Sequence, residues 1–397
     1  MQNSVRLTGL RYGLTDVMEI SVITDEKVFH ELRDEWNTLL GKSKSQCIFL
    51  RWEWLYTWWS SYRERGDQLN ILVVRQDGKT IGIAPLYLRK RYLNALREIT
   101  FLGSNVVCSD YLDFILMEGV ERETLLTMLS FVRKNGYEWD VIRLTDMPSE
   151  SGSIPILQEY FGSNRVEVDL HYRECPFIDL GGRWESACKG VSASQGMNIR
   201  RKVRKFSELP GSAFFEVETK AELNWYFDEF VRLNKLRMRM KRQRSPFSDD
   251  EFVQFHRRIL DQLFDAGMAK LCFLKIGDDL VAGIYLLFFG EKYYYYQSGF
   301  DPAWRRLSPG TVMFYFCIQD AVGRGAKEFD LLQGGEDYKY SWTKRKRLNA
   351  KAVVYNGTAK GEMAKTVHEY LVRVRSFVRE QLGKGSGMKE GCGSDLS

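Results

Sequence analysis

The sequence predicts a mixed α/β fold built from two similar units. The chain has 397 residues, which is more than one compact core usually holds. Hydrophobic residues make up 44% and charged residues 28%, a balance typical of globular domains. The same order of elements is also expected twice: a strand, two helices, three antiparallel strands, a helix, a strand and a short helix.

In the first half, residues 18–23 alternate between apolar and polar like a strand, and helical spacing follows from Asp25 to Leu40. A second helix, rich in aromatic residues, is expected at 52–62. Strands at 69–75 and 80–88 flank an Asp-Gly pair, and this predicts a hairpin because glycine accepts the positive φ of a tight turn. A strand near 99–102, a helix at 121–135 and a strand at 139–144 complete the unit.

The second half repeats this plan. We expect a strand at 213–218, a long helix at 221–240 and a second helix that ends near Gly267. Strands at 271–276, 280–289 and 293–299 follow, then a helix at 309–322 and a strand at 329–332.

These patterns divide the chain into four parts. Residues 1–17 are expected to form an N-terminal arm, 18–180 the first unit and 181–382 the second unit with a C-terminal helix. Residues 383–397 are rich in Gly and Ser without an apolar period, which predicts a disordered tail.

The net charge of +6 and the pI of about 8.8 are mildly basic. Much of the excess lies in residues 200–205 and 344–347. Such clusters can bind phosphates of a cofactor, nucleic acid or an anionic membrane, or can be the solvated face of a helix. The sequence leaves these alternatives open.

Cysteine and histidine patterns argue against disulfides and metal. The seven Cys show no CxxC pairing, which indicates reduced thiols, and the four His have no metal-ligand spacing. We therefore expect no metal site. No signal segment precedes the first strand, and the most apolar stretch, 280–289, is too short to span a bilayer. These features predict a cytoplasmic protein without a transmembrane segment.

A strand, a basic turn and a helix start follow one another between residues 293 and 310. Ser308 is expected to be the N-cap, Pro309 suits the first helical position, and Gly310 lets a ligand approach the backbone. Free N–H groups at a helix start attract anions, and Arg305 and Arg306 add positive charge. The alternative interpretation is an ordinary well-capped helix.

Several motifs in both halves have a counterpart in one known family. In the second half these are Ser308-Pro309-Gly310, residues 325–339 and Trp342; in the first they are Trp54, Trp58, Trp59 and residues 82–86, 101–103 and 110–113. Over residues 18–356 the chain resembles the GNAT-like family of cellulose-biosynthesis (CelD-type) acetyltransferase-like proteins. That family is related to Fem-type aminoacyltransferases, which also pair two GNAT units.

The resemblance implies tandem GNAT-like units and acyl-CoA as the cosubstrate. The pyrophosphate would lie on backbone amides from Leu307 to Gly310, beside Arg305 and Arg306. The corresponding stretch of the first half, 119–123, is acidic, so a single donor site is expected, in the second unit. The chain lacks the glycine-rich phosphate loop of simple GNAT enzymes, and Fem-type relatives use aminoacyl-tRNA instead.

Acyl transfer requires a base for the acceptor and an acid for the departing thiolate. The candidates are Asp110, Asp330, Glu336 and Tyr338; Asp330 could instead cap a turn, and Tyr338 could belong to the core. We expect the first-half segment at Asp110 and the segment at 336–338 to face one shared, aromatic-lined cleft.

Three further residues are candidates for binding the acceptor: Tyr111, Lys339 and Trp342. Core packing for Trp342 and a solvated surface position for Lys339 are the alternatives.

The expected function is transfer of an acyl group from acyl-CoA to an amine or hydroxyl of a sugar or related acceptor, in polysaccharide or cell-envelope biosynthesis. Expected partners are the saccharide or small-molecule acceptor and envelope-synthesis enzymes. One alternative is a Fem-like aminoacyl-tRNA-dependent transferase, the only case in which nucleic acid is expected, with residues 200–205 on the tRNA. Another is a catalytically silent binding protein of a polysaccharide-synthesis complex.

Overall fold

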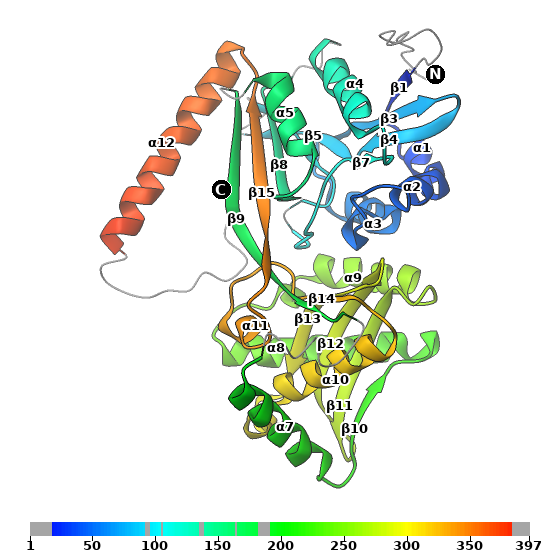
Figure 1. Ribbon diagram of the computed structural model, residues 1–397, viewed down its shortest axis with the longest axis vertical. Coiled ribbons are helices and arrows are strands. Elements are labelled where there is room, and N and C mark those ends of the chain that lie inside the picture. Colours follow the sequence, from blue (N-terminus) through cyan, green and yellow to red (C-terminus); the bar gives the residue numbers. More distant parts are fainter. Residues whose placement is uncertain are drawn as a thin grey trace.

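A computed structural model describes residues 18–91, 96–104, 106–134, 139–162, 165–181 and 191–382. The expected N-terminal arm (1–17) and C-terminal tail (383–397) lie outside these residues. Within them, helices flank two β-sheets, which confirms the mixed α/β fold (Figure 1).

The first half begins with a strand, a helical pair and a hairpin, as expected. Asp25 accepts hydrogen bonds from the N–H groups of Lys27 and Val28 and so starts the first helix. The hairpin turns at Asp77 and Gly78, both with positive φ. The elements are β1 (Met18–Ile23), α1 (Glu26–Glu31), α2 (Arg33–Leu40), η1 (Ile48–Leu50), α3 (Trp52–Tyr62), β2 (Gln68–Leu69), β3 (Ile71–Gln76), β4 (Lys79–Ala84), β5 (Leu86–Arg91), β6 (Leu96–Phe101), β7 (Ile115–Leu116), α4 (Glu121–Lys134), β8 (Val141–Pro148), α5 (Ser153–Phe161) and β9 (Val166–Asp179).

The strand expected at 80–88 is two strands in different sheets. β4 ends at Ala84 and pairs with β3 and β7 in a four-stranded sheet, whereas β5 begins at Leu86 and belongs to an eleven-stranded sheet. Pro85 lies between them and has no N–H for a ladder, so the chain can change sheets there.

The second half contains the expected helices and antiparallel strands. Its elements are α7 (Ala193–Ser207), β10 (Ser212–Glu216), α8 (Lys220–Met240), η3 (Pro246–Ser248), α9 (Asp250–Leu263), β11 (Ala269–Ile276), β12 (Asp279–Phe289), β13 (Lys292–Phe300), η4 (Pro302–Leu307), α10 (Pro309–Gly323), β14 (Glu328–Asp330), α11 (Asp337–Tyr340), β15 (Lys346–Tyr355) and α12 (Ala359–Leu382). The apolar residues of α8 and α9 join the first half's core, whereas α10 and Phe206 of α7 build a second core. None of the described helices is long and apolar enough to cross a bilayer.

Two long strands connect the halves, and the sequence analysis did not anticipate them. β9 pairs with β14 at its C-terminal end and with β15 along most of its length, and β15 also pairs with β8. The order β10-β11-β12-β13-β14-β9-β15-β8-β6-β5-β2 therefore runs through both halves (Figure 1). β15 and the following α12, both beyond residue 181, lie against strands of the first half. The division of the chain near residue 180 stays a prediction.

A buried ion-pair cluster lies where β9, β14 and β15 meet. Arg347 on β15 donates to both oxygens of Glu328 at 2.9 and 2.6 Å and to Asp330 at 3.0 Å. Its guanidinium also stacks on Phe177 of β9, 4.2 Å from the ring centre. Burial raises the pKa of the Asp330 carboxyl to about 6, although Arg347 opposes this rise.

Replacing Arg347 with Gln is predicted to destabilise the protein by about 3–5 kcal/mol at neutral pH, because a buried carboxylate loses its cation. Without Arg347 the pKa of Asp330 rises further, and a protonated Asp330 needs no cation. The loss of stability should therefore be largest at high pH. It should shrink as the pH falls through the raised pKa that Asp330 has in the variant. Chemical denaturation between pH 5 and 8 measures this.

Arg345→Gln is the matched control, because Arg345 pairs with Asp179 at the surface, where both side chains are more than half exposed. Its loss should cost less than about 1 kcal/mol. Equal, pH-independent effects of the two substitutions would contradict this account of the cluster.

Candidate functional site

Two parallel strands of the second half pair over a short stretch and then separate. β13 and β14 pair only from Lys292–Tyr294 to Glu328–Asp330. β14 ends there, whereas β13 continues to Phe300, with an irregularity in its pairing to β12 next to Tyr296. We call the region between the continuing β13 and the chain after β14 the slot. Parallel strands that separate expose backbone and side chains at their carboxyl ends, where ligands bind in open α/β sheets.

Hydroxyl groups line the slot. The Tyr295 hydroxyl lies 2.6 Å from that of Ser298, and the Tyr338 hydroxyl donates to Tyr295 at 3.5 Å. Tyr338 comes from α11, so this contact joins the two sides of the slot. Burial and the neighbouring Tyr295 raise the pKa of the Tyr338 phenol well above its usual value. Tyr338 therefore stays protonated at neutral pH and can donate a hydrogen bond.

Two cations from the C-terminal end of α8 lie over the Tyr338 ring. The Arg237 guanidinium carbon is 6.0 Å and the Lys241 ammonium nitrogen 5.9 Å from the ring centre. Burial, with Arg237 next to it, lowers the pKa of Lys241. The sequence analysis missed both residues. The signal was the run from Lys235 to Arg244, which carries cations at short intervals and no carboxylate.

The N-terminus of α10 follows β13 and the short helix η4 that carries the expected basic turn. Ser308, however, does not cap it by its side chain: with φ of 54° it adopts a left-handed conformation in which the hydroxyl makes no capping hydrogen bond. Among the residues that the structure describes, the Gly310 N–H has no acceptor, and a Cβ placed on Gly310 would meet no atom within 4 Å. Arg305 and Arg306, on η4, are exposed, and Leu307 is half-buried. These residues leave an open, positively charged helix start that fits a phosphate group.

The corresponding helix start in the first half is already satisfied. Glu121, the first residue of α4, accepts from the Gly119 N–H at 2.8 Å and pairs with Lys44 at 2.8 Å. A carboxylate thus occupies the position where an anion would bind. The two halves therefore differ in charge at the starts of α4 and α10. Of these two helices, α10 is the one whose start carries no carboxylate.

The structure brings Asp110, Tyr111 and Asp330 together but buries all three, at 2%, 7% and 0% exposure. The Tyr111 hydroxyl donates to Asp330 at 3.1 Å. Asp110 accepts from the Gln333 N–H at 2.9 Å and from Asn349 at 2.7 Å. Burial, and then the nearby Asp146, raise the pKa of Asp110 well above its usual value. At these residues the expected open cleft is therefore a packed junction, because the chain after β14 covers them.

Lys339 holds the chain after β14 in place. Its ammonium group donates to the carbonyls of Leu332 and Gln333 at 3.1 and 2.7 Å and lies 3.1 Å from the Glu336 carboxylate. Those three partners match the three N–H donors of lysine, so none is left for an acceptor in this conformation. Lys339 thus holds the loop in this conformation, and its expected contact with the acceptor stays a prediction. The Glu336 side chain is half exposed and remains accessible.

Trp342 is also a structural residue. Its ring stacks on that of Phe314 of α10, with 5.8 Å between the ring centres, and only 6% of the residue is exposed. The interpretation as core packing fits this position, and Trp342 is separated from solvent by the second core.

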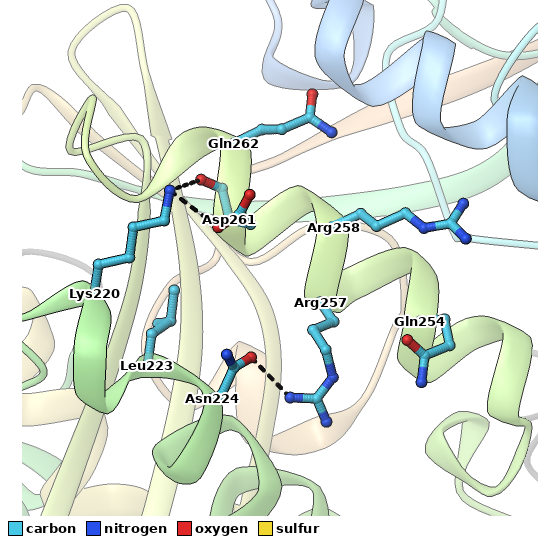
Figure 2. A pocket seen from close by; sticks show the side chains of 8 residues that line it. All are labelled: Lys220, Leu223, Asn224, Gln254, Arg257, Arg258, Asp261 and Gln262. Carbon is cyan, nitrogen blue, oxygen red and sulfur yellow. Dashed lines mark hydrogen bonds and ion pairs between the residues drawn. The ribbon is translucent and has the colours of Figure 1, made fainter.

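A pocket of about 310 Å³ lies elsewhere, between α8 and α9 (Figure 2). Two of its three cations have partners in the pocket: Lys220 contacts Asp261 at 3.0 Å, and Arg257 donates to Asn224 at 2.9 Å (Figure 2). The third, Arg258, donates to the Ser61 hydroxyl of α3 at 3.4 Å. We do not assign a function to it.

Comparison with known proteins adds a family and a fold. Residues 193–340 match the model of the acetyltransferase (GNAT) domain. This segment contains α10, the slot and α11. No curated protein matches the sequence significantly.

Solved structures of similar fold cover most of the chain. The crystal structure of FemX has a TM-score of 0.61 and 12% identity and covers 81% of this chain and 95% of its own. A conserved protein of unknown function from Bacteroides thetaiotaomicron has a TM-score of 0.56 and 11% identity, with coverage of 84% and 100%. The C-terminal domain (DUF2156) of a putative lysylphosphatidylglycerol synthetase from Agrobacterium fabrum has a TM-score of 0.51 and 11% identity, with coverage of 85% and 95%.

At these identities the structural matches show a shared fold and nothing about substrates. The domain match and the fold agree with the resemblance found in the sequence and confirm it. Residues 193–340 therefore form a GNAT acetyltransferase domain, within a fold that the structural matches extend over most of the chain.

Proposed function

We propose that this protein transfers an acyl group from acyl-CoA to an amine or hydroxyl of a sugar or related acceptor, in polysaccharide or cell-envelope biosynthesis. The observation that carries the proposal is the open start of α10 within the matched GNAT domain, next to the slot between β13 and the chain after β14.

The donor's phosphates would bind at the start of α10. The unpaired Gly310 N–H and the positive end of a 15-residue helix favour an anion, and Arg305 and Arg306 lie on the preceding turn. The pantetheine arm would then enter the slot beside β13, whose backbone continues past the end of β14. This places the thioester near the hydroxyls of Tyr295 and Tyr338.

Two residues of the slot can serve the chemistry. The acceptor nitrogen or oxygen attacks the thioester carbonyl carbon, and Glu336, which is accessible, takes the proton that the acceptor loses. The carbon–sulfur bond then breaks, and the departing thiolate takes a proton from the Tyr338 phenol. Arg237 and Lys241 lie beside this phenol. Their positive charges stabilise the phenolate that Tyr338 becomes after it has given its proton to the thiolate.

Aminoacyl-tRNA is the second candidate donor, and the cations of α7 favour it. A direct comparison separates the two: acyl transfer to amino sugars is followed with acetyl-CoA, longer acyl-CoAs and aminoacyl-tRNA as donors. Thiol release with acyl-CoA supports the proposal, and transfer from aminoacyl-tRNA alone refutes it. Absence of transfer from every donor, together with absence of donor binding, would favour the silent binding protein.

The Gly310→Asp variant is predicted to fold normally but lose CoA binding. A side chain fits at position 310, and a carboxylate at a helix start stabilises the helix, so the melting temperature should not fall. The same carboxylate repels the pyrophosphate, and CoA affinity measured by calorimetry should drop at least about a hundred-fold.

Gly323→Asp is the matched control, because Gly323 also has open space but lies at the opposite end of the same helix. It should bind CoA like the wild type. If Gly310→Asp also binds CoA normally, the start of α10 is not the donor site.

The Tyr338→Phe variant is predicted to lower kcat by about a hundred- to ten-thousand-fold while the donor affinity stays the same, because it removes only the proton donor. Steady-state thiol release measures kcat, and calorimetry measures donor affinity. Tyr340→Phe is the control on the same short helix: its hydroxyl bonds to Glu174, away from the slot. Equal turnover of the two variants would exclude Tyr338 as the acid.

A further inference from the structure

Three neighbouring segments of the second half carry many cations and no carboxylate: α7, the C-terminal end of α8 with the following turn, and η4. η4 contacts both helices, so the three segments border one another. We call their exposed cations the basic rim, which consists of Arg200, Arg201, Arg204, Lys205, Arg239, Lys241, Arg242, Arg244, Arg305 and Arg306. The whole chain has a net charge of only +6, so positive charge is concentrated at this end.

The cations of the rim are largely unneutralised. Among the described residues, Arg204 is the one rim cation with a carboxylate within 4 Å, and its distance to Glu208 is 3.7 Å. The phosphates of a single donor at Gly310 would engage Arg305 and Arg306 and leave α7 without a counter-charge. The cations of α7 are therefore available to a larger anionic partner.

α7 is amphipathic in a particular way. Val203 and Phe206 turn inward, and the ring of Phe206 packs on that of Phe316 of α10, with 6.3 Å between the ring centres. The opposite face carries Met197, Arg201 and Arg204, which recur at spacings of four and three residues. Met197 is 61% exposed, so an apolar side chain protrudes among cations.

α8 ends with the same combination. Met240, 42% exposed, lies between Arg239 and Lys241. Within the three segments these two methionines are the exposed large apolar residues, and no Trp, Tyr or Phe is exposed there; Trp304 of η4 is half-buried against the second core. Single-stranded nucleic acid is bound with exposed aromatic rings that stack on bases. Cations around protruding apolar side chains suit the interface of an anionic bilayer.

We propose that the basic rim docks the protein on an anionic phospholipid surface, with Met197 and Met240 entering the headgroup region. The docking does not depend on the proposed donor or acceptor. It holds the acetyltransferase domain at a membrane surface without a membrane-spanning helix.

Co-sedimentation of the full-length protein with vesicles tests the proposal. Vesicles of phosphatidylcholine with about 40% phosphatidylglycerol should bind the protein at about 0.1 M salt and release it at about 1 M, where charges are screened within about 3 Å. Vesicles of phosphatidylcholine alone should not bind it. Equal binding to both vesicles, or to neither, overturns the proposal.

Two variants locate the contact on α7. The triple charge reversal Arg201→Glu, Arg204→Glu, Lys205→Glu should weaken binding to the anionic vesicles at least about ten-fold. The matched control reverses three exposed lysines of the first half, Lys27, Lys42 and Lys134, with the same change in net charge, and should bind normally. Melting temperatures establish that both variants fold. If the two triple variants lose binding equally, the rim is not the docking surface.

Met197→Ser separates a bilayer from a nucleic acid, because it leaves the charge unchanged. It should weaken vesicle binding, while binding to an RNA duplex, which needs the cations alone, should not change. If the protein binds RNA but not anionic vesicles, or if Met197→Ser binds vesicles like the wild type, the proposal is wrong.

Discussion

The ion pair between Arg347 and the carboxylates of Glu328 and Asp330 fixes β14 against β15 at the junction of the two halves of the molecule. It lies where strands from both halves share one sheet, and it neutralises the fully buried carboxylate of Asp330. A buried carboxylate without a cation would favour the unfolded chain or a protonated group. The position of β14 therefore depends on Arg347 of β15, although these strands are not hydrogen-bonded to each other.

The slot depends on this arrangement. β14 stops after Asp330, and the chain then turns through Leu332, which has a positive φ, and Gly334. Gly334 has a φ of 126°, a conformation that residues with a Cβ rarely adopt, so glycine is needed there. The Lys339 ammonium group donates hydrogen bonds to the carbonyls of Leu332 and Gln333 in this turn. The resulting loop carries Glu336 and leads into α11, whose Tyr338 contacts Tyr295 of β13.

The sequence predicted the elements that local patterns determine. The helix at 52–62 and the turn at Asp77-Gly78 follow from residue spacing and backbone preferences, and both are present. β9 and β15 were missed, because their pairing is with residues far away in the chain and leaves no local signal. The same limit applies to the site. The sequence placed the anion site at the start of α10, but the burial of Asp110 and the satisfied ammonium of Lys339 depend on a loop that packs over them only in the folded chain.

The central claim is that the donor binds once, along the start of α10 and the slot, and not at the equivalent helix of the first half. Amide hydrogen exchange with and without CoA tests this most directly, because ligand contact slows exchange of the amides it covers. The account predicts added protection at residues 295–299 and 310–312 and no change at 119–123. Protection confined to the first half, or none near Gly310 while CoA is bound, would contradict it.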